Sequence, residues 1–155
     1  MPRITLIAVA VYTSCVAVVA AADRPIDRPA ADGAAALDQQ RMQGRWTREF
    51  TNPQRAVFRV EKVIDGNRET VTTFDTNGNT IESHTDNFQL KLDGRVRVFT
   101  YSNYVVTAGP NLGAQFPGPS SYLYKLDGDT LHEVWGLLEG DRAAPIAFAW
   151  KRIKN

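Results

Sequence analysis

The sequence predicts an all-β fold: an eight-stranded antiparallel meander closed into a barrel, with one short helix before it. Three observations support this prediction. From Gly44 onward, apolar and polar residues alternate with a period of two, as in strands with one buried face. Turn sequences such as Asp93-Gly94 and Asp127-Gly128 join these segments at short spacing. No long segment with the period of an amphipathic helix lies between them.

Eight segments have this strand pattern, and residues typical of turns bound them. In chain order they are residues 45–50, 57–64, 69–74, 88–92, 95–101, 122–126, 131–135 and 146–152. Next-neighbour pairing of such strands forms a meander, and closure of the meander into a barrel removes its exposed edges. The interior of an eight-stranded barrel holds either side chains or one small ligand.

The connection over residues 108–119 is rich in glycine and proline, and it separates two of the predicted strands. A loop of this length in a compact domain often carries a function. Two interpretations stay open. The segment is either a lid over the mouth of the barrel or a solvated crossover with Phe116 packed onto the core.

The first 22 residues indicate export. Met1-Pro2-Arg3 carries a positive charge, residues 4–19 are mostly apolar, and Ala20-Ala21-Ala22 has the small-residue pattern that a signal peptidase reads. We expect a signal peptide over residues 1–22, cleavage near Ala22, and a periplasmic or secreted mature chain without a membrane span. A retained membrane anchor is the alternative, although its length is marginal for a spanning helix.

Residues 23–36 are rich in proline, alanine and charge, which predicts a disordered linker. Residues 34–42 have helix-favouring composition, with Asp32 as the expected N-cap. In this short helix, Leu37 and Met42 are expected to cover one end of the structure that follows.

Residues 37–155 are enough for one domain with one hydrophobic core. Cys15 is the one cysteine and lies in the leader, so the mature domain depends on burial rather than on disulfides. The chain has 18 basic and 17 acidic residues. Loss of Arg3 with the leader balances these charges, which argues against nucleic acid or an anionic membrane as the main partner.

Two motifs resemble those of the lipocalins and their short, exported bacterial relatives. Gly44-x-Trp46 enters the first strand after a short helix, and Arg152 ends the last strand. Residues 122–131, Tyr-x-Tyr-x-Leu-Asp-Gly-Asp-Thr-Leu, are similar to the penultimate hairpin of these domains. The resemblance implies a lipocalin-like barrel in which the tryptophan packs beneath the arginine at the closed end, so Gly44, Trp46 and Arg152 have structural roles. The Thr-Asp-Tyr motif of full lipocalins is absent, which favours the small lipocalin-like domain over a transporter.

Alternation also indicates which side chains face the barrel interior. If Trp46 points inward, Arg48 and Phe50 do as well, and the same argument applies to three later strands. Such residues would form a pocket for an amphipathic molecule, with Arg48 and Glu133 as polar anchors. A barrel filled by its own aromatic side chains, with those two residues paired at the rim, stays open. The candidate ligand-binding residues are Arg48, Phe50, Tyr122, Tyr124, Glu133, Trp135 and Phe148.

We expect no catalytic residue, metal or cofactor. Ser83 and His84 are neighbours on one strand, so they point to opposite faces and cannot form a nucleophile–base pair. His84 and Asp86 share a face, but a metal site would also need His132 to converge with them from another strand. The aspartates around Gly78 and Gly128 do not have the spacing of a calcium loop and are expected to form turns.

These patterns predict an exported, non-enzymatic barrel that binds a small apolar or amphipathic molecule in its interior. The alternative is an envelope-associated interaction module with a filled barrel, which acts through an exposed surface such as residues 108–119. Its protein partner is not indicated by the sequence. A cavity on the order of several hundred Å³ favours the first hypothesis, whereas isolated voids favour the second.

Overall fold

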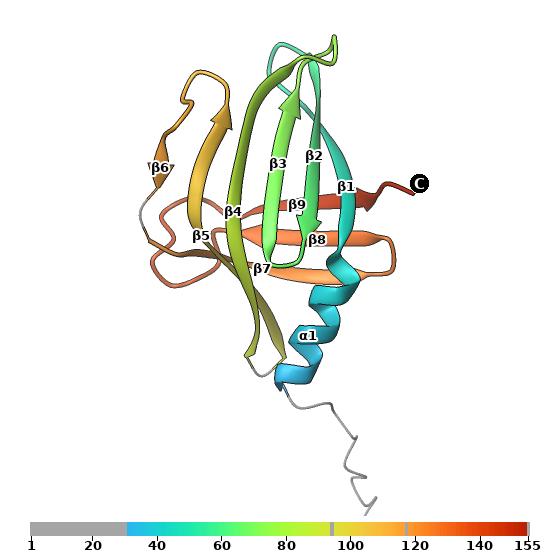
Figure 1. Cartoon of the computed structure of the whole chain (residues 1–155), viewed down its shortest axis with the longest axis vertical. Coiled ribbons are helices and arrows are strands. Elements are labelled where there is room, and N and C mark those ends of the chain that lie inside the picture. The colour runs from blue at the N-terminus through green and yellow to red at the C-terminus, as the bar shows by residue number, and fades with distance from the viewer. Residues whose placement is uncertain (1–30, 94, 117, 155) are drawn as a thin grey trace, which may run out of the picture.

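The structure is a computed structural model that describes residues 31–93, 95–116 and 118–154. The predicted signal peptide lies outside these residues. Within them, one helix precedes nine strands (Figure 1). The elements are α1 (Ala31–Met42), β1 (Gly44–Thr51), β2 (Val57–Asp65), β3 (Arg68–Phe74), β4 (Thr80–Asp93), β5 (Val96–Ala108), β6 (Gln115–Phe116), β7 (Ser120–Asp127), β8 (Thr130–Trp135) and β9 (Ile146–Arg152).

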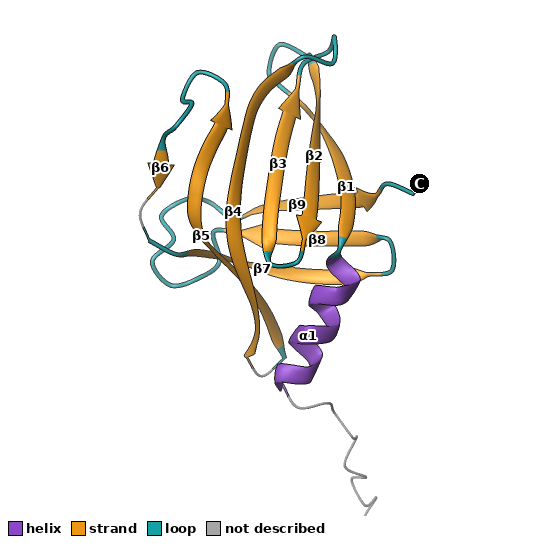
Figure 2. Ribbon diagram, in the orientation of Figure 1, coloured by secondary structure: helices purple, strands orange, loops and turns teal. Residues whose placement is uncertain are grey.

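Eight of the strands form a closed antiparallel barrel, as the alternation pattern predicted. Neighbours pair in the order β4-β3-β2-β1-β9-β8-β7-β5, and β4 also pairs with β5, which closes the circle. Figure 1 shows β1 to β4 running roughly upright while β7, β8 and β9 cross behind them. Figure 2 shows that helix α1 lies at one end of this barrel. No helix in the described part of the chain is long and apolar enough to cross a membrane.

The first and last strands of the barrel meet at Trp46 and Arg152, which are direct partners in the β1–β9 pair. The Arg152 guanidinium carbon lies 4.0 Å from the centre of the Trp46 ring. Arg152 also donates hydrogen bonds to the backbone carbonyls of Gln43, at 2.7 Å, and Arg41. Because this junction pairs the first strand of the barrel with the last, it is needed for the sheet to close into a cylinder.

Strands β4 and β5 are longer than the sequence predicted. The expected strand over residues 88–92 begins at Thr80, and its partner continues to Ala108. Residues 80–87 are mostly polar, which hid the strand pattern, but they pair with β3 on one side and largely with β5 on the other. Two register shifts interrupt the β4–β5 pairing, between Ser83 and His84 and between Thr85 and Asn87. Such shifts break the strict alternation from which these strands were predicted.

The segment predicted as a long loop folds back onto the barrel. Its residues Gln115 and Phe116 form β6, which pairs with Val105 and Tyr104 of β5. Gly109 makes the reversal with a φ of +102°, and a Cβ there would lie 2.5 Å from the Ile81 carbonyl oxygen. Only glycine fits this position without strain.

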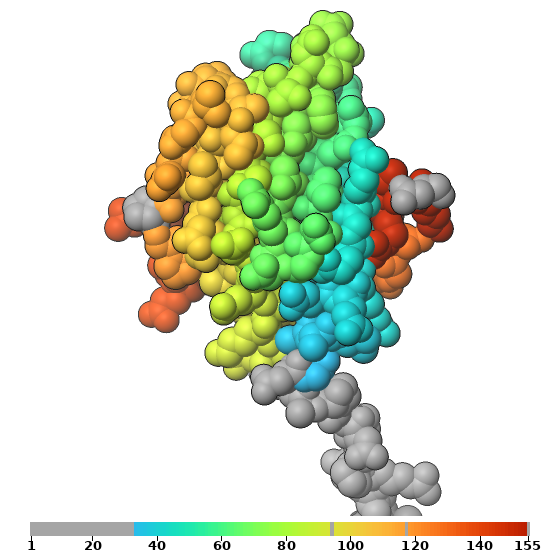
Figure 3. Space-filling model, viewed as in Figure 1, coloured from blue at the N-terminus to red at the C-terminus, as the bar shows by residue number. Residues whose placement is uncertain are grey.

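Helix α1 begins at Ala31, so the predicted linker over residues 23–36 was too long at its C-terminal end. The alanine-rich stretch favours helix over disorder once it packs against the barrel. The space-filling view shows α1 against the lower end of the barrel (Figure 3). Met42 is fully buried there, but Leu37 is 42% exposed, so the prediction that Leu37 covers the barrel end was wrong. Asp38 faces the barrel instead and is buried.

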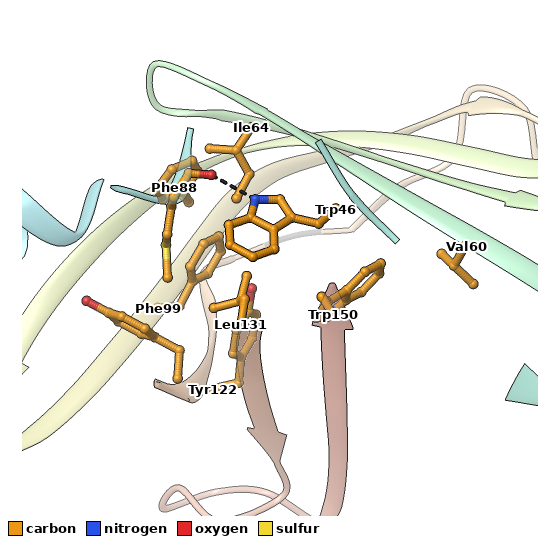
Figure 4. Close-up of a cluster of buried hydrophobic side chains, with 10 residues drawn as sticks. Trp46, Val60, Ile64, Phe88, Phe99, Tyr122, Leu131 and Trp150 are labelled. Atoms are coloured by element: carbon orange, nitrogen blue, oxygen red, sulfur yellow. Dashed lines mark hydrogen bonds between the residues drawn. The ribbon is translucent and has the colours of Figure 1, made fainter. Parts of the chain in front are cut away.

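A hydrophobic core fills the end of the barrel near α1 (Figure 4). Trp46 lies at its centre, and its indole nitrogen donates a hydrogen bond of 2.8 Å to the carbonyl oxygen of Met42. Phe88, Phe99 and Tyr122 stack in a row, with ring centres 4.6 Å apart at each step. The barrel is therefore packed solid at this end, and its free interior volume lies toward the other end.

Candidate functional site

The barrel contains a cavity of about 560 Å³, within the usual range for small-molecule sites. Exposed Phe116 and Gly118 are among its lining residues, so the cavity reaches solvent beside the β6 segment. The barrel is thus filled near α1 and hollow toward its other end. The lining residues are Arg48, Lys62, Glu69, Val71, His84, Asp86, Tyr101, Tyr104, Phe116, Gly118, Ser120, Tyr122, Glu133, Trp135, Phe148 and Trp150.

Five of the seven ligand-binding residues predicted from the sequence line this cavity. They are Arg48, Tyr122, Glu133, Trp135 and Phe148. Phe50 and Tyr124 lie elsewhere. Phe50 lies beyond the two residues of β1 that pair with β9, and it is 39% exposed and stacks on Phe58. Tyr124 is buried near α1, where its hydroxyl donates a 3.1 Å hydrogen bond to Asp38.

A buried ion network that the sequence analysis missed borders the cavity. Lys62 is 1% exposed, and its ammonium group contacts the carboxylates of Glu69, at 2.9 Å, and Glu133. The Tyr122 hydroxyl lies 3.4 Å from the Lys62 nitrogen and donates to Glu133 at 3.2 Å. The alternation of Val60, Lys62 and Ile64 could have revealed this lysine, since it shares a strand face with two apolar residues.

Lys62 keeps its charge because its two carboxylate partners compensate for its burial. Burial lowers the pKa of Lys62, but the charges of Glu133 and Glu69 and their hydrogen bonds together raise it above the ordinary value. Burial raises the pKa of Glu69, and Lys62 offsets this only in part. A buried lysine with two carboxylate partners therefore stays protonated at neutral pH.

His84 and Asp86 project from β4 into the same cavity. Burial, followed by the charge of Lys62, lowers the pKa of His84 to about 4, so its imidazole is neutral at pH 7. Burial and the Glu69 carboxylate raise the pKa of Asp86 to about 8. The His84 ring stacks on Tyr104 at 4.3 Å between ring centres. His132, the third residue considered for a metal site, is not among the lining residues and lies on the alternate face of β8.

Arg48 lies on the opposite wall, among aromatic rings. Its guanidinium carbon is 4.2 Å from the centre of Phe148 and 4.8 Å from that of Trp150. Desolvation by burial lowers the pKa of Arg48, and Glu133 acts in the opposite direction. The Arg48 guanidinium group thus packs against aromatic rings. It does not form the rim pair with Glu133 that the sequence analysis kept as an alternative, because the close cationic partner of Glu133 is Lys62.

Aromatic side chains line the outer part of the cavity. Trp135 stacks on Tyr122, with ring centres 4.5 Å apart, and lies 5.7 Å from Tyr101. Tyr104 contacts the edge of Phe116 at 4.9 Å, which brings the β6 segment to the cavity wall. Phe116 is 58% exposed, so it is not packed onto the core as the crossover interpretation of residues 108–119 required, and a lid over the mouth stays a prediction.

The polar atoms of the cavity lining are incompletely paired. Among the described residues, every buried side-chain nitrogen or oxygen without a hydrogen-bond partner belongs to a residue of this cavity. Three are donors and two are carboxylate oxygens, and one of these, Glu69 Oε2, keeps Lys62 nearby as an ion pair. Buried polar atoms without a hydrogen-bond partner destabilise a protein unless a ligand or water supplies that partner. They are Arg48 Nε, Trp135 Nε1, Trp150 Nε1, Asp86 Oδ1 and Glu69 Oε2.

Comparisons with known proteins found no match to a family model, to a curated protein or to a solved structure. The site offers an aromatic enclosure, three unpaired donors and a carboxyl-rich wall inside one closed barrel.

Proposed function

We propose that this protein binds one small amphipathic molecule inside its β-barrel and does not transform it. The observation that carries the proposal is a cavity of about 560 Å³ whose lining contains the unpaired buried polar atoms of the described chain. A cavity of this size suits a drug-sized or lipid-sized ligand.

The lining supports an amphipathic ligand rather than a purely apolar one. The rings of Tyr101, Tyr104, Phe116 and Trp135 offer apolar area near the mouth. Among the same lining residues, Arg48 and the indole groups of Trp135 and Trp150 have donors without partners. A ligand with an apolar body and an oxygen-bearing head group would satisfy these donors and cover the rings.

The absence of a reaction is part of the same proposal, and the environment of His84 supports it. Ser83, the hydroxyl nearest to His84 in sequence, shares a 3.0 Å hydrogen bond with Thr72 and is not among the lining residues. A nucleophile–base pair between these two neighbours is therefore unsupported, because they lie on different sides of β4.

We propose that the protein acts after export, and that it is a relative of the small lipocalin-like domains. The apolar leader over residues 1–22 supports export. The contact between Trp46 and Arg152 supports the relationship, because it matches the motif that carries the resemblance. N-terminal sequencing of protein made with its own leader tests export. A mature chain that begins near Asp23 is expected, and an unprocessed chain in the cytoplasm would contradict it.

Binding is tested by titration of a fluorescent fatty-acid analogue into the purified protein. Saturation near one equivalent is expected, with quenching of tryptophan emission because Trp135 and Trp150 line the cavity. Arg48→Met should weaken binding by about tenfold or more, since a hydrogen bond to a charged group contributes about 1.5–3 kcal/mol. Arg45→Met is the matched control, because Arg45 lies on the same strand and pairs with Glu61 outside the cavity. Non-saturable binding, or equal loss in both variants, would refute the proposal.

A further inference from the structure

Three side chains that commonly bind metal ions converge on the cavity wall formed by β3 and β4. Glu69 and Asp86 are direct partners across the two strands, and His84 lies two residues before Asp86 on the same strand. One ligand atom from each residue can be chosen so that all three lie within 4.8 Å of one another. All three residues line the cavity.

Asp86 provides a second observation that points to a missing partner. Asp86 as a residue is 3% exposed, and its Oδ1 atom accepts no hydrogen bond from the described residues. An unpaired polar atom buried in this way costs about 1–3 kcal/mol, and more when it is charged. A native protein that keeps such a group in a cavity wall is expected to satisfy it with a ligand, an ion or water.

The charges around Asp86 also leave room for a cation. Lys62 forms ion pairs with Glu69 and Glu133, and among the described residues no ion pair joins a cation directly to Asp86. Arg48, the other cation of the lining, lies against the rings of Phe148 and Trp150. Two carboxylates placed directly opposite each other on neighbouring strands repel unless a proton or a cation lies between them.

We propose that Glu69, His84 and Asp86 bind one divalent transition-metal ion, such as Zn²⁺, inside the barrel. One imidazole nitrogen and two carboxylate oxygens form a ligand set that Zn²⁺ and its neighbours in the first transition series accept. Three protein ligands leave a coordination position open, and in this site that position faces the cavity. Water or a polar group of a bound molecule would occupy it.

The geometry requires only local adjustment to form this site. Zinc bonds to nitrogen and oxygen are about 2.0–2.2 Å, so its donor atoms lie roughly 3–3.5 Å apart. The three side chains must therefore approach one another by about 1–2 Å, which small χ rotations supply. Glu69 has two oxygens, so it can keep Lys62 on one and offer the other. The neutral imidazole of His84 at pH 7 is already in the protonation state that binds a metal.

The test is a Co²⁺ titration of the protein after treatment with a chelator. Bound Co²⁺ has visible absorption that reports its ligands, and its unpaired electrons quench nearby tryptophans. We expect saturation at one equivalent, quenching of tryptophan emission, and displacement of Co²⁺ by Zn²⁺. Co²⁺ binding is measured without the fatty-acid analogue, so its outcome is independent of the test of ligand binding.

Two variants and one control locate the site. His84→Ala should weaken Co²⁺ binding by about 100-fold or more, since the loss of a residue that merely supports a ligand already costs about 10- to 100-fold. Asp86→Asn should have a similar effect while preserving the shape of the side chain. His132→Ala should bind as the wild type does, because His132 lies on the alternate face of β8.

Circular dichroism of each variant shows whether it has folded. The proposal is overturned if the wild-type protein takes up no stoichiometric Co²⁺, because Asp86 then keeps a proton instead of a metal. It is also overturned if folded His84→Ala binds Co²⁺ as tightly as the wild type, or if His132→Ala loses binding.

Discussion

Arg152 lies over the indole ring of Trp46, with its guanidinium carbon 4.0 Å from the ring centre, and the two residues are register partners across the junction of β1 and β9. The described pairing at this junction is short, since it includes only one further pair, Thr47 with Lys151. Besides a 2.8 Å backbone hydrogen bond from Ile153 to Arg45, the side-chain contacts of Arg152 therefore help to hold the first and last strands together.

Replacement of Arg152 by methionine should lower the free energy of unfolding by about 2–4 kcal/mol. The change removes a cation–π contact of about 1 kcal/mol and charged hydrogen bonds to two backbone carbonyls. Urea denaturation followed by tryptophan fluorescence measures the loss. Lys151→Met, one residue earlier and exposed, should cost less than about 1 kcal/mol. Equal losses in the two variants would mean that the Trp46–Arg152 contact is not what stabilises the junction.

Helix α1 is attached to the barrel through the buried carboxylate of Asp38. Its Oδ2 atom accepts hydrogen bonds from Arg97 Nε, at 2.6 Å, and from the Tyr124 hydroxyl, at 3.1 Å. Asp38→Ala leaves both donors without this acceptor and should destabilise the protein by about 1–3 kcal/mol. Amide hydrogen exchange should show loss of protection across α1 in particular. Asp127→Ala, at an exposed position, is the control, and unchanged protection of α1 in Asp38→Ala would refute this role.

Lys62 holds two buried glutamates, so its removal should be far more costly than that of a surface lysine. Lys62→Met leaves Glu69 and Glu133 without their ammonium partner, and breaking a buried ion pair in this way costs about 3–5 kcal/mol. Lys125→Met breaks an exposed pair with Asp127 and should cost at most about 1 kcal/mol. Thermal and urea denaturation of the two variants compare them directly. A Lys62→Met protein as stable as Lys125→Met would show that the network does not need its cation.

Closure of the barrel was predictable from sequence, because it depends on alternation and on short motifs near the two chain ends. Trp46 and Arg152 belong to these motifs, and the predicted strand over residues 146–152 coincides with β9. The prediction failed where alternation is interrupted. Polar residues and register shifts hid the first half of β4, although that half carries His84 and Asp86.

The cavity wall was predictable only in part, for a related reason. Regular alternation on three strands allowed the inward-facing side chains to be predicted from one inward-facing tryptophan on each strand. The residues found in this way are Arg48, Glu133, Trp135 and Phe148. The side chains of Lys62, Glu69 and Asp86 meet from three different strands. Which strands are neighbours, and in what register, is a property of the closed sheet that a single sequence does not specify. Cavity volume likewise depends on how all these side chains pack.

A comparison of two valine-to-phenylalanine variants tests directly whether the hollow barrel takes one small molecule. Val71 lines the cavity from β3, whereas Val63 is exposed on the outer face of β2. In a titration with the fluorescent fatty-acid analogue, Val71→Phe should abolish stoichiometric binding by filling the cavity, and Val63→Phe should bind as the wild type does. Unimpaired binding by a folded Val71→Phe protein would show that the molecule does not bind inside the barrel.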